Sequence, residues 1–158
     1  MGRLLLKPVF YAILERKYSG SIEDQKLLQP IVYLLKVNGV ELWEYYNFYW
    51  YEKIGPYSQV LKNDVIGLDE VPIIKISYDN YTAEQMLNLK YTLEKNGSYT
   101  LLKWANCLAS VHYIESNFFN KGISEEIVLK ELVTRKPDLN DDKNNHLAYK
   151  LVKTYLTW

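Results

Sequence analysis

The stretch from Trp43 to Tyr51 constrains this chain most, because seven of its nine residues are aromatic. Such a composition favours a β-strand, in which successive side chains point to opposite faces. Alternation places Tyr46, Phe48 and Trp50 on one face, and Tyr45, Asn47, Tyr49 and Tyr51 on the other. A strand with two aromatic faces is most simply covered on both sides. An exposed aromatic face would instead stack on bases or anchor a protein partner.

Most of the remaining chain has helical periodicity, with apolar residues recurring every three or four positions. Helix N-termini are predicted at hydroxyl residues whose side chains can accept a hydrogen bond from the first turn: Ser21, Ser58, Thr82 and Ser124. Pro30 lies inside the helix that follows Ser21 and predicts a kink or break there. The continuous apolar stripe from Leu101 to His112 indicates a central helix.

These patterns predict a mostly helical α+β protein. The segment from Pro72 to Ile76 is predicted to be a second strand that could pair with the aromatic one, and Gly55-Pro56 predicts a turn. The length of 158 residues suits one domain, and no linker rich in Gly, Ser or Pro divides it. We therefore expect residues 1–158 to form a single domain, with sub-lobes at 1–80 and 81–158 as the conceivable division.

The formal charges balance, with 19 Lys+Arg against 19 Asp+Glu. Non-specific coating of nucleic acid normally requires a basic excess, so it is disfavoured, although a local basic patch is not. The apolar run after Met1 is too short for a signal peptide, and no stretch approaches the about 18 apolar residues of a membrane span. We expect a cytoplasmic protein that does not contact a membrane.

The residues that could carry chemistry are few. Common nucleotide-binding and hydrolase motifs are absent. His112 and Glu115 lie three residues apart on one helical face, so they could begin a metal site or an acid–base pair, or form a polar pair at the rim of the core. His146 is the only other histidine, and the lone Cys107 indicates a small buried side chain rather than a nucleophile. We expect no enzyme, no cofactor and no metal site.

A second candidate surface is the turn after the aromatic strand and the helix that follows it. That helix would expose Gln59, Lys62 and Asn63, whose side chains can read base edges in a major groove. The neighbouring Asp64 and the acidic surroundings argue against approach to phosphates. A turn followed by a solvated helix face is the simpler interpretation.

Several segments resemble one known family, the YwgA-like uncharacterised proteins. Residues 25–35, the aromatic run and Gly55–Ser58 resemble its pattern "LQKLVYLL … Y.F..Y.YGPYS..L..DL", and residues 108–114 resemble its "LASIHYL" helix. The pattern is also similar, more distantly, to the Panacea (SocA-like) antitoxin domain. Pro30 stands where the family has a basic residue, so any contact of that residue is missing here.

This resemblance implies a winged-helix-like N-terminal part with a short β-hairpin and a helical C-terminal part. It also implies an association with toxin–antitoxin, prophage or host-defence systems, and it implies no catalytic site. We therefore expect a non-catalytic regulator that binds a protein partner such as a toxin, a nuclease or another defence or phage component. The contact residues are expected to be Tyr46, Phe48, Trp50, Gly55, Pro56, Tyr57 and Ser58.

Two other functions remain open. One is a sequence-specific, DNA-binding winged-helix regulator that uses Gln59, Lys62 and Asn63, although the neutral net charge disfavours nucleic acid. The other is an enzyme or a small-ligand sensor built around His112 and Glu115, which would need a pocket with perturbed titrating groups. A homodimer is left open by the sequence.

Overall fold

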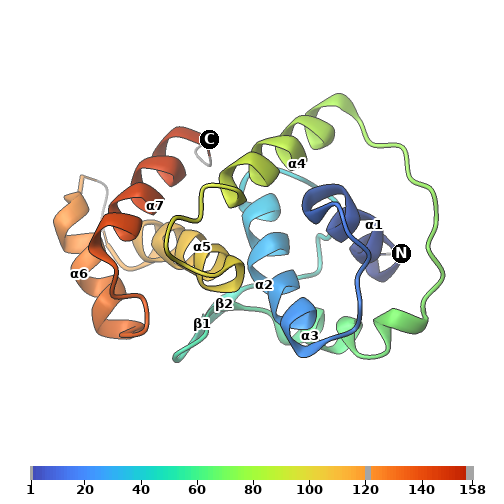
Figure 1. The fold of residues 1–158 in the computed structure, drawn as a ribbon, viewed down its shortest axis with the longest axis horizontal. Helices are drawn as coiled ribbons and strands as arrows, with labels where there is room; N and C mark the ends of the chain where they lie inside the picture. Colours follow the sequence, from blue (N-terminus) through green and yellow to red (C-terminus); the bar gives the residue numbers. More distant parts are fainter. Residues whose placement is uncertain (1, 120–121, 156–158) are drawn as a thin grey trace.

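Helices account for most of the structure, which is a computed structural model that describes residues 2–119 and 122–155 (Figure 1). The elements follow in the order α1 (Gly2–Leu14), α2 (Ile22–Val37), β1 (Tyr49–Tyr51), β2 (Gly55–Tyr57), α3 (Gln59–Val65), the 3₁₀ turn η1 (Leu68–Glu70), α4 (Asn80–Leu93), α5 (Leu101–Asn117), α6 (Glu125–Arg135) and α7 (Asp142–Tyr155). The prediction of a mostly helical α+β protein is confirmed.

The helix N-termini follow the predicted capping chemistry with one exception. The hydroxyl groups of Ser21, Ser58 and Ser124 each accept a hydrogen bond from a backbone N–H of the first turn. The prediction for Thr82 is wrong, because Asp79 caps α4 and accepts the hydrogen bond from the Thr82 N–H at 2.7 Å. A carboxylate is the stronger acceptor and is favoured at the positive end of the helix dipole.

Pro30 does not break α2, which runs without interruption from Ile22 to Val37. Proline removes one backbone hydrogen bond, but Pro30 and its neighbours Leu28 and Ile31 are buried, so packing holds the helix together around it. Pro8 likewise lies inside α1 without ending it.

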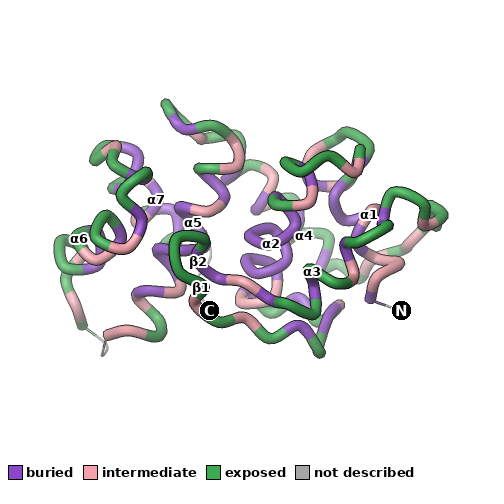
Figure 2. The backbone as a smooth tube through the Cα atoms, turned by 90° about the horizontal axis from the view of Figure 1, so that it is seen from below, coloured by how far each residue is buried: buried purple, intermediate pink, exposed green. Residues whose placement is uncertain are grey.

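The core is centred on α2 and α5, which pack against each other. Figure 2 shows both helices buried for most of their length. α1 and α4 lie on one side of this pair, while α6 and α7 pack against α5 on the other (Figure 1). One contiguous cluster of buried side chains extends from Leu6 to Val152 and includes the indole rings of Trp43 and Trp104. The predicted central position of the helix from Leu101 is confirmed.

The two strands form an antiparallel hairpin in which Tyr49 pairs with Tyr57 and Tyr51 with Gly55. The prediction of a second strand at residues 72–76 is wrong, since this segment runs outside the body of the molecule between η1 and α4 (Figure 1). A hairpin closed by a few residues costs less loop entropy than pairing across some twenty residues. In the order of the chain, the hairpin follows α2 and precedes α3. The winged-helix arrangement of the N-terminal part stays a prediction.

Candidate functional site

The hairpin is fastened to α2 by a single amide side chain. Gln29 is buried, and its side-chain amide contacts Ser58, the residue that caps the N-terminus of α3. Its Nε2 donates to the carbonyl oxygen of Ser58 at 2.9 Å, and its Oε1 accepts from the Ser58 N–H at 2.9 Å. These two bonds reproduce the reciprocal pair that a neighbouring strand would make. The Gly-Pro-Tyr-Ser segment is thus held in place by a glutamine whose role the sequence analysis missed.

The other side of the hairpin is fitted against α5 and the segment after α6. Gly55 has a φ of +105°, and a Cβ atom built there would lie 2.7 Å from Ser110 Oγ. Only glycine combines that backbone conformation with such a close approach. The Lys136 ammonium donates to the carbonyl oxygen of Ile54 at 2.7 Å. The hairpin is therefore held by α2, by α5 and by the residue that follows α6, and it presents a fixed outer face.

Four of the residues predicted to contact a partner are buried and cannot do so in this fold. They are Tyr46, Gly55, Pro56 and Ser58. The Tyr46 ring stacks on Trp43, and its hydroxyl donates to Asp64 Oδ2 at 2.6 Å. Burial and this hydrogen bond raise the pKa of Tyr46. These four residues are therefore part of the protein interior rather than of its surface.

Phe48 and Trp50 are half-buried and also face inward. The Phe48 ring meets Tyr33 of α2, and the Trp50 ring meets Tyr113 and Phe118 at the end of α5. The alternation predicted for residues 45–51 is present in the burial pattern, although only Tyr49–Tyr51 is a regular strand. The face predicted to bind is the one that packs on the protein.

The outer face of the hairpin carries three tyrosines in mutual contact, which we call the tyrosine cluster: Tyr49, Tyr51 and Tyr57. Their ring centroids are 5.1 to 6.4 Å apart. Residues Tyr49 and Tyr51 are 42% and 48% exposed. Tyrosine rings on a rigid support offer large contact area at a small cost in side-chain entropy. The cluster has the composition of a protein-binding surface.

A groove of about 500 Å³ opens beside the hairpin. Five lysines line it and define what we call the lysine groove: Lys26, Lys53, Lys62, Lys103 and Lys136. Tyr57 belongs to both the groove and the tyrosine cluster, so the two features share an edge. No local sequence signal indicated this groove, because its lysines are far apart in the chain.

The residues predicted to contact DNA lie on the surface of α3. Gln59, Lys62 and Asn63 are exposed, and Gln59 Nε2 donates to Asn63 Oδ1 at 3.0 Å. α3 has seven residues, which is short for a helix that must reach across a major groove. Only Lys62 of these three also lines the lysine groove.

The structure gives His112 and Glu115 different partners. The hydroxyl of Tyr33 lies 2.6 Å from His112 Nδ1, while Glu115 Oε1 accepts from Lys153 at 3.0 Å. Burial lowers the pKa of His112 to about 4, so its ring is neutral at pH 7. A buried neutral imidazole that accepts from tyrosine links α2 to α5, and the two predicted residues do not form an acid–base pair.

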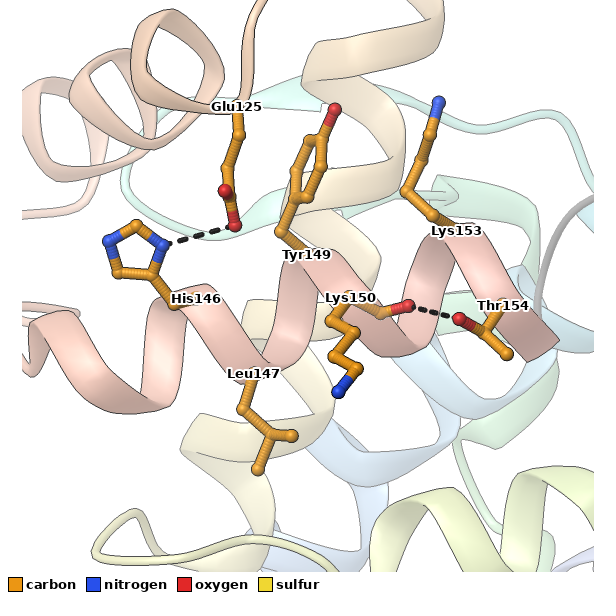
Figure 3. A pocket seen from close by; sticks show the side chains of 7 residues that line it. All are labelled: Glu125, His146, Leu147, Tyr149, Lys150, Lys153 and Thr154. Carbon is orange, nitrogen blue, oxygen red and sulfur yellow. Dashed lines mark hydrogen bonds and ion pairs between the residues drawn. The ribbon is translucent and has the colours of Figure 1, made fainter.

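Cys107 and His146 lie in different surroundings. Cys107 is buried near Asn145, and burial raises the pKa of its thiol to about 12, so it is protonated at neutral pH. His146 points toward Glu125 across an open hollow between α6 and α7 (Figure 3). The distance from its Nδ1 to Glu125 Oε1 is 3.0 Å. No group of three or more metal-ligating side chains occurs among residues 2–119 and 122–155.

Comparisons with protein-family models, with curated proteins and with solved structures found nothing that matches this chain. None of the helices that the described residues form is long and apolar enough to cross a membrane. The inference of function therefore depends on the geometry of the hairpin, the tyrosine cluster and the groove.

Proposed function

We propose that this protein is a non-catalytic regulator that binds a protein partner through the tyrosine cluster. The single observation that carries the proposal is the arrangement of Tyr49, Tyr51 and Tyr57, whose rings contact one another on the outer face of an anchored hairpin. Tyrosines on a surface that is ordered before binding are typical interaction hot spots.

The support beneath the cluster favours binding over another role for these rings. The Gln29 amide, the close fit of Gly55 and the Lys136 ammonium all hold backbone atoms of the hairpin or of the residue that follows it. A short hairpin by itself is marginally stable, so these anchors are what keep its outer face in one conformation. A partner that binds there pays little to order it.

The proposal includes no chemical step. His112 is held neutral by burial and Cys107 is held as a thiol, and neither side chain lies on the tyrosine cluster. The family resemblance of the sequence suggests the kind of regulation, which is that of an antitoxin or of a prophage or host-defence component. The partner would then be a toxin, a nuclease or another component of such a system.

The test uses the tagged protein as bait in a lysate of its native host. The bait is compared with the double variant Tyr49→Ser/Tyr51→Ser and with Tyr11→Ser, a matched control at a residue of α1 that is 56% exposed. The proposal predicts at least one protein that is captured by the parent and by Tyr11→Ser but not by the double variant. Equal capture by all three baits would contradict it.

A DNA-binding regulator is the alternative, and the exposure of Gln59, Lys62 and Asn63 together with the nearby lysines favours it. It predicts binding to duplex DNA that weakens with salt, and a loss of that binding in Lys62→Gln. Asp64, which lies on the same short helix, opposes phosphate contact there. A gel-shift assay at low salt that shows no complex would exclude this alternative.

A further inference from the structure

The lysine groove has the charge and the size of a small-molecule site, and we infer that it binds a nucleotide, with the phosphates among the lysines and the base against the apolar wall. This inference goes beyond the proposed function, because it requires no protein partner, although the groove and the tyrosine cluster share Tyr57. The site is assigned from three observations: the convergence of the lysines, the burial of one of them, and the chemistry of the groove wall.

The five lysines come from five different parts of the fold. Lys26 lies on α2, Lys53 on the hairpin turn, Lys62 on α3, Lys103 on α5, and Lys136 directly after α6. The groove has one carboxylate in its lining, which belongs to Asp138. The whole chain has no net charge, so this concentration of positive charge is local. Like charges repel, and a cluster of this kind is stabilised by an anion.

Lys136 is the buried lysine of the groove, where burial lowers the pKa of its ammonium group and the charge of Asp138 acts in the opposite direction. Lys136 is only 3% exposed, and its Nζ donates to the carbonyl oxygens of Ile54 at 2.7 Å and Lys53 at 3.4 Å. Across residues 2–119 and 122–155, no carboxylate lies within 4.0 Å of any of the five ammonium groups. Buried charges in proteins are usually paired. An anion bound in the groove would add its negative charge to that of Asp138.

The volume of the groove helps to decide between two classes of anion, a phosphate ester and an acidic peptide. About 500 Å³ lies within the usual range of small-molecule sites. A peptide segment of that size would bring only one or two carboxylates, whereas a nucleoside diphosphate brings a higher charge in the same space. Lysine ammonium groups are regular ligands of phosphate. The observations therefore favour a phosphate ester over an acidic peptide.

The rest of the groove wall suits the organic part of a nucleotide. Ile54 and Leu102 provide apolar surface, and the Tyr57 ring stands at the edge where it can stack on a base. Asn106 is half-buried in the lining and carries an amide that can donate and accept hydrogen bonds. Inorganic phosphate would leave this part of the groove empty.

The inference is tested on the purified protein by amide NMR titration with each of the four ribonucleoside 5′-diphosphates at low salt. We expect at least one to bind with a dissociation constant below about 1 mM. The shifted resonances should include those of Lys103, Asn106 and Tyr57. Adenosine should not bind, and pyrophosphate should bind at least about tenfold more weakly than the best nucleotide.

The variant Lys26→Gln/Lys103→Gln removes two exposed lysines of the groove and should weaken the nucleotide by about tenfold or more. The control Lys75→Gln/Lys143→Gln removes two exposed lysines that do not line the groove and should leave binding within about twofold. Both variants change the net charge equally, so the comparison isolates the position of the charge.

Four outcomes would overturn the inference. They are the absence of binding by all four nucleotides, equal affinity in the groove and control variants, equal affinity for pyrophosphate and the best nucleotide, and binding of a hexaglutamate peptide or a single-stranded oligonucleotide where no mononucleotide binds. Loss of partner capture in the tyrosine variant would not bear on any of them, so the two proposals can fail separately.

Discussion

Gln29 is the residue on which the position of the hairpin most depends. Replacing it with leucine leaves the buried Ser58 N–H without a partner, whereas the Ser58 carbonyl oxygen still accepts a hydrogen bond from the Lys62 N–H at 3.0 Å. Because an unpaired buried polar group costs about 1–3 kcal/mol, Gln29→Leu should lower the free energy of unfolding by about 1–3 kcal/mol. Urea denaturation followed by circular dichroism measures this change.

The control for this prediction is Gln59→Leu, which makes the same chemical change at an exposed position of α3. The Gln59 amide bonds only to Asn63 on the surface, so the free energy of unfolding should change by less than about 0.5 kcal/mol. Equal denaturation midpoints for the Gln29 and Gln59 variants would show that the two bonds to Ser58 contribute nothing.

Gly55 offers a second test at the residue scale, because the cost of a steric clash at this position can be separated from the cost of its positive φ. Gly55 and Gly122 both have positive φ, but only a Cβ at Gly55 would meet another atom, Ser110 Oγ at 2.7 Å. Gly55→Ala and Gly122→Ala should each lower the free energy of unfolding by about 1–2 kcal/mol through backbone strain. Gly55→Ala should lower it by at least about 1 kcal/mol more, because of the steric clash. Thermal unfolding of the two variants gives the comparison.

Ser110 completes this test. Its Oγ is buried and has no hydrogen-bond partner among the described residues, so Ser110→Ala should be neutral or stabilising. It should also recover part of the loss caused by Gly55→Ala, because the atom that is contacted is gone. Strict additivity of the two changes in a double-mutant cycle would contradict the close approach.

At the scale of elements, the contact between α2 and α5 should depend on pH through His112. Burial also raises the pKa of Tyr33, so its hydroxyl stays protonated and can donate to His112 Nδ1. The pKa of His112 is about 4 in the folded chain against 6.5 when unfolded. The unfolded chain therefore binds more protons between these values, and stability falls as pH falls from about 6.5 to 4.

The loss should be on the order of 3 kcal/mol across this window. The Asp24 carboxylate has a pKa of about 2, so its contribution is lost below the window rather than within it. Urea unfolding at several pH values should show a clearly flatter pH dependence for His112→Gln than for the parent. An unchanged slope in this variant would contradict a neutral, buried His112.

His146 supplies the control, because its shift has the opposite sign. The exposed ring is paired with Glu125 and Asp142, and the bond to Glu125 raises the pKa of His146. Its contribution is present below its unfolded pKa and is lost as pH rises, so His146→Gln should not flatten the fall of stability at low pH.

The helices and strands could be predicted where the residues that determine them are close together in the sequence. Serine caps at 21, 58 and 124 act within one helical turn, and the structure confirms them. The prediction of Thr82 as a cap was wrong because α4 begins earlier, at Asn80, so that Thr82 lies inside the helix and Asp79 caps it. The prediction that residues 72–76 pair with the aromatic strand was wrong as well, because that strand pairs with Gly55–Tyr57. Strand pairing depends on the entropy of loop closure and on contacts with α2 and α5, which no local pattern shows.

At the scale of the whole molecule, the alternation of side chains along the aromatic run was predictable, but which of its two faces packs against the protein was not. A period of two shows that Tyr49 and Tyr51 oppose Trp50, and only the position of α5 shows that Trp50 faces inward. The lysine groove was beyond prediction for a similar reason. Its five lysines are spread from residue 26 to residue 136, and the packing of the helices brings them together.

The central claim is that the outer tyrosines of the hairpin hold a protein partner. Its most direct measurement is isothermal titration of the captured and purified partner with three forms: the parent, Tyr49→Ser/Tyr51→Ser and Tyr11→Ser. Loss of two hot-spot rings should weaken binding by about 100-fold or more, with the denaturation midpoint unchanged. Tyr11→Ser should bind within about twofold of the parent. Equal affinities for all three forms would contradict the account.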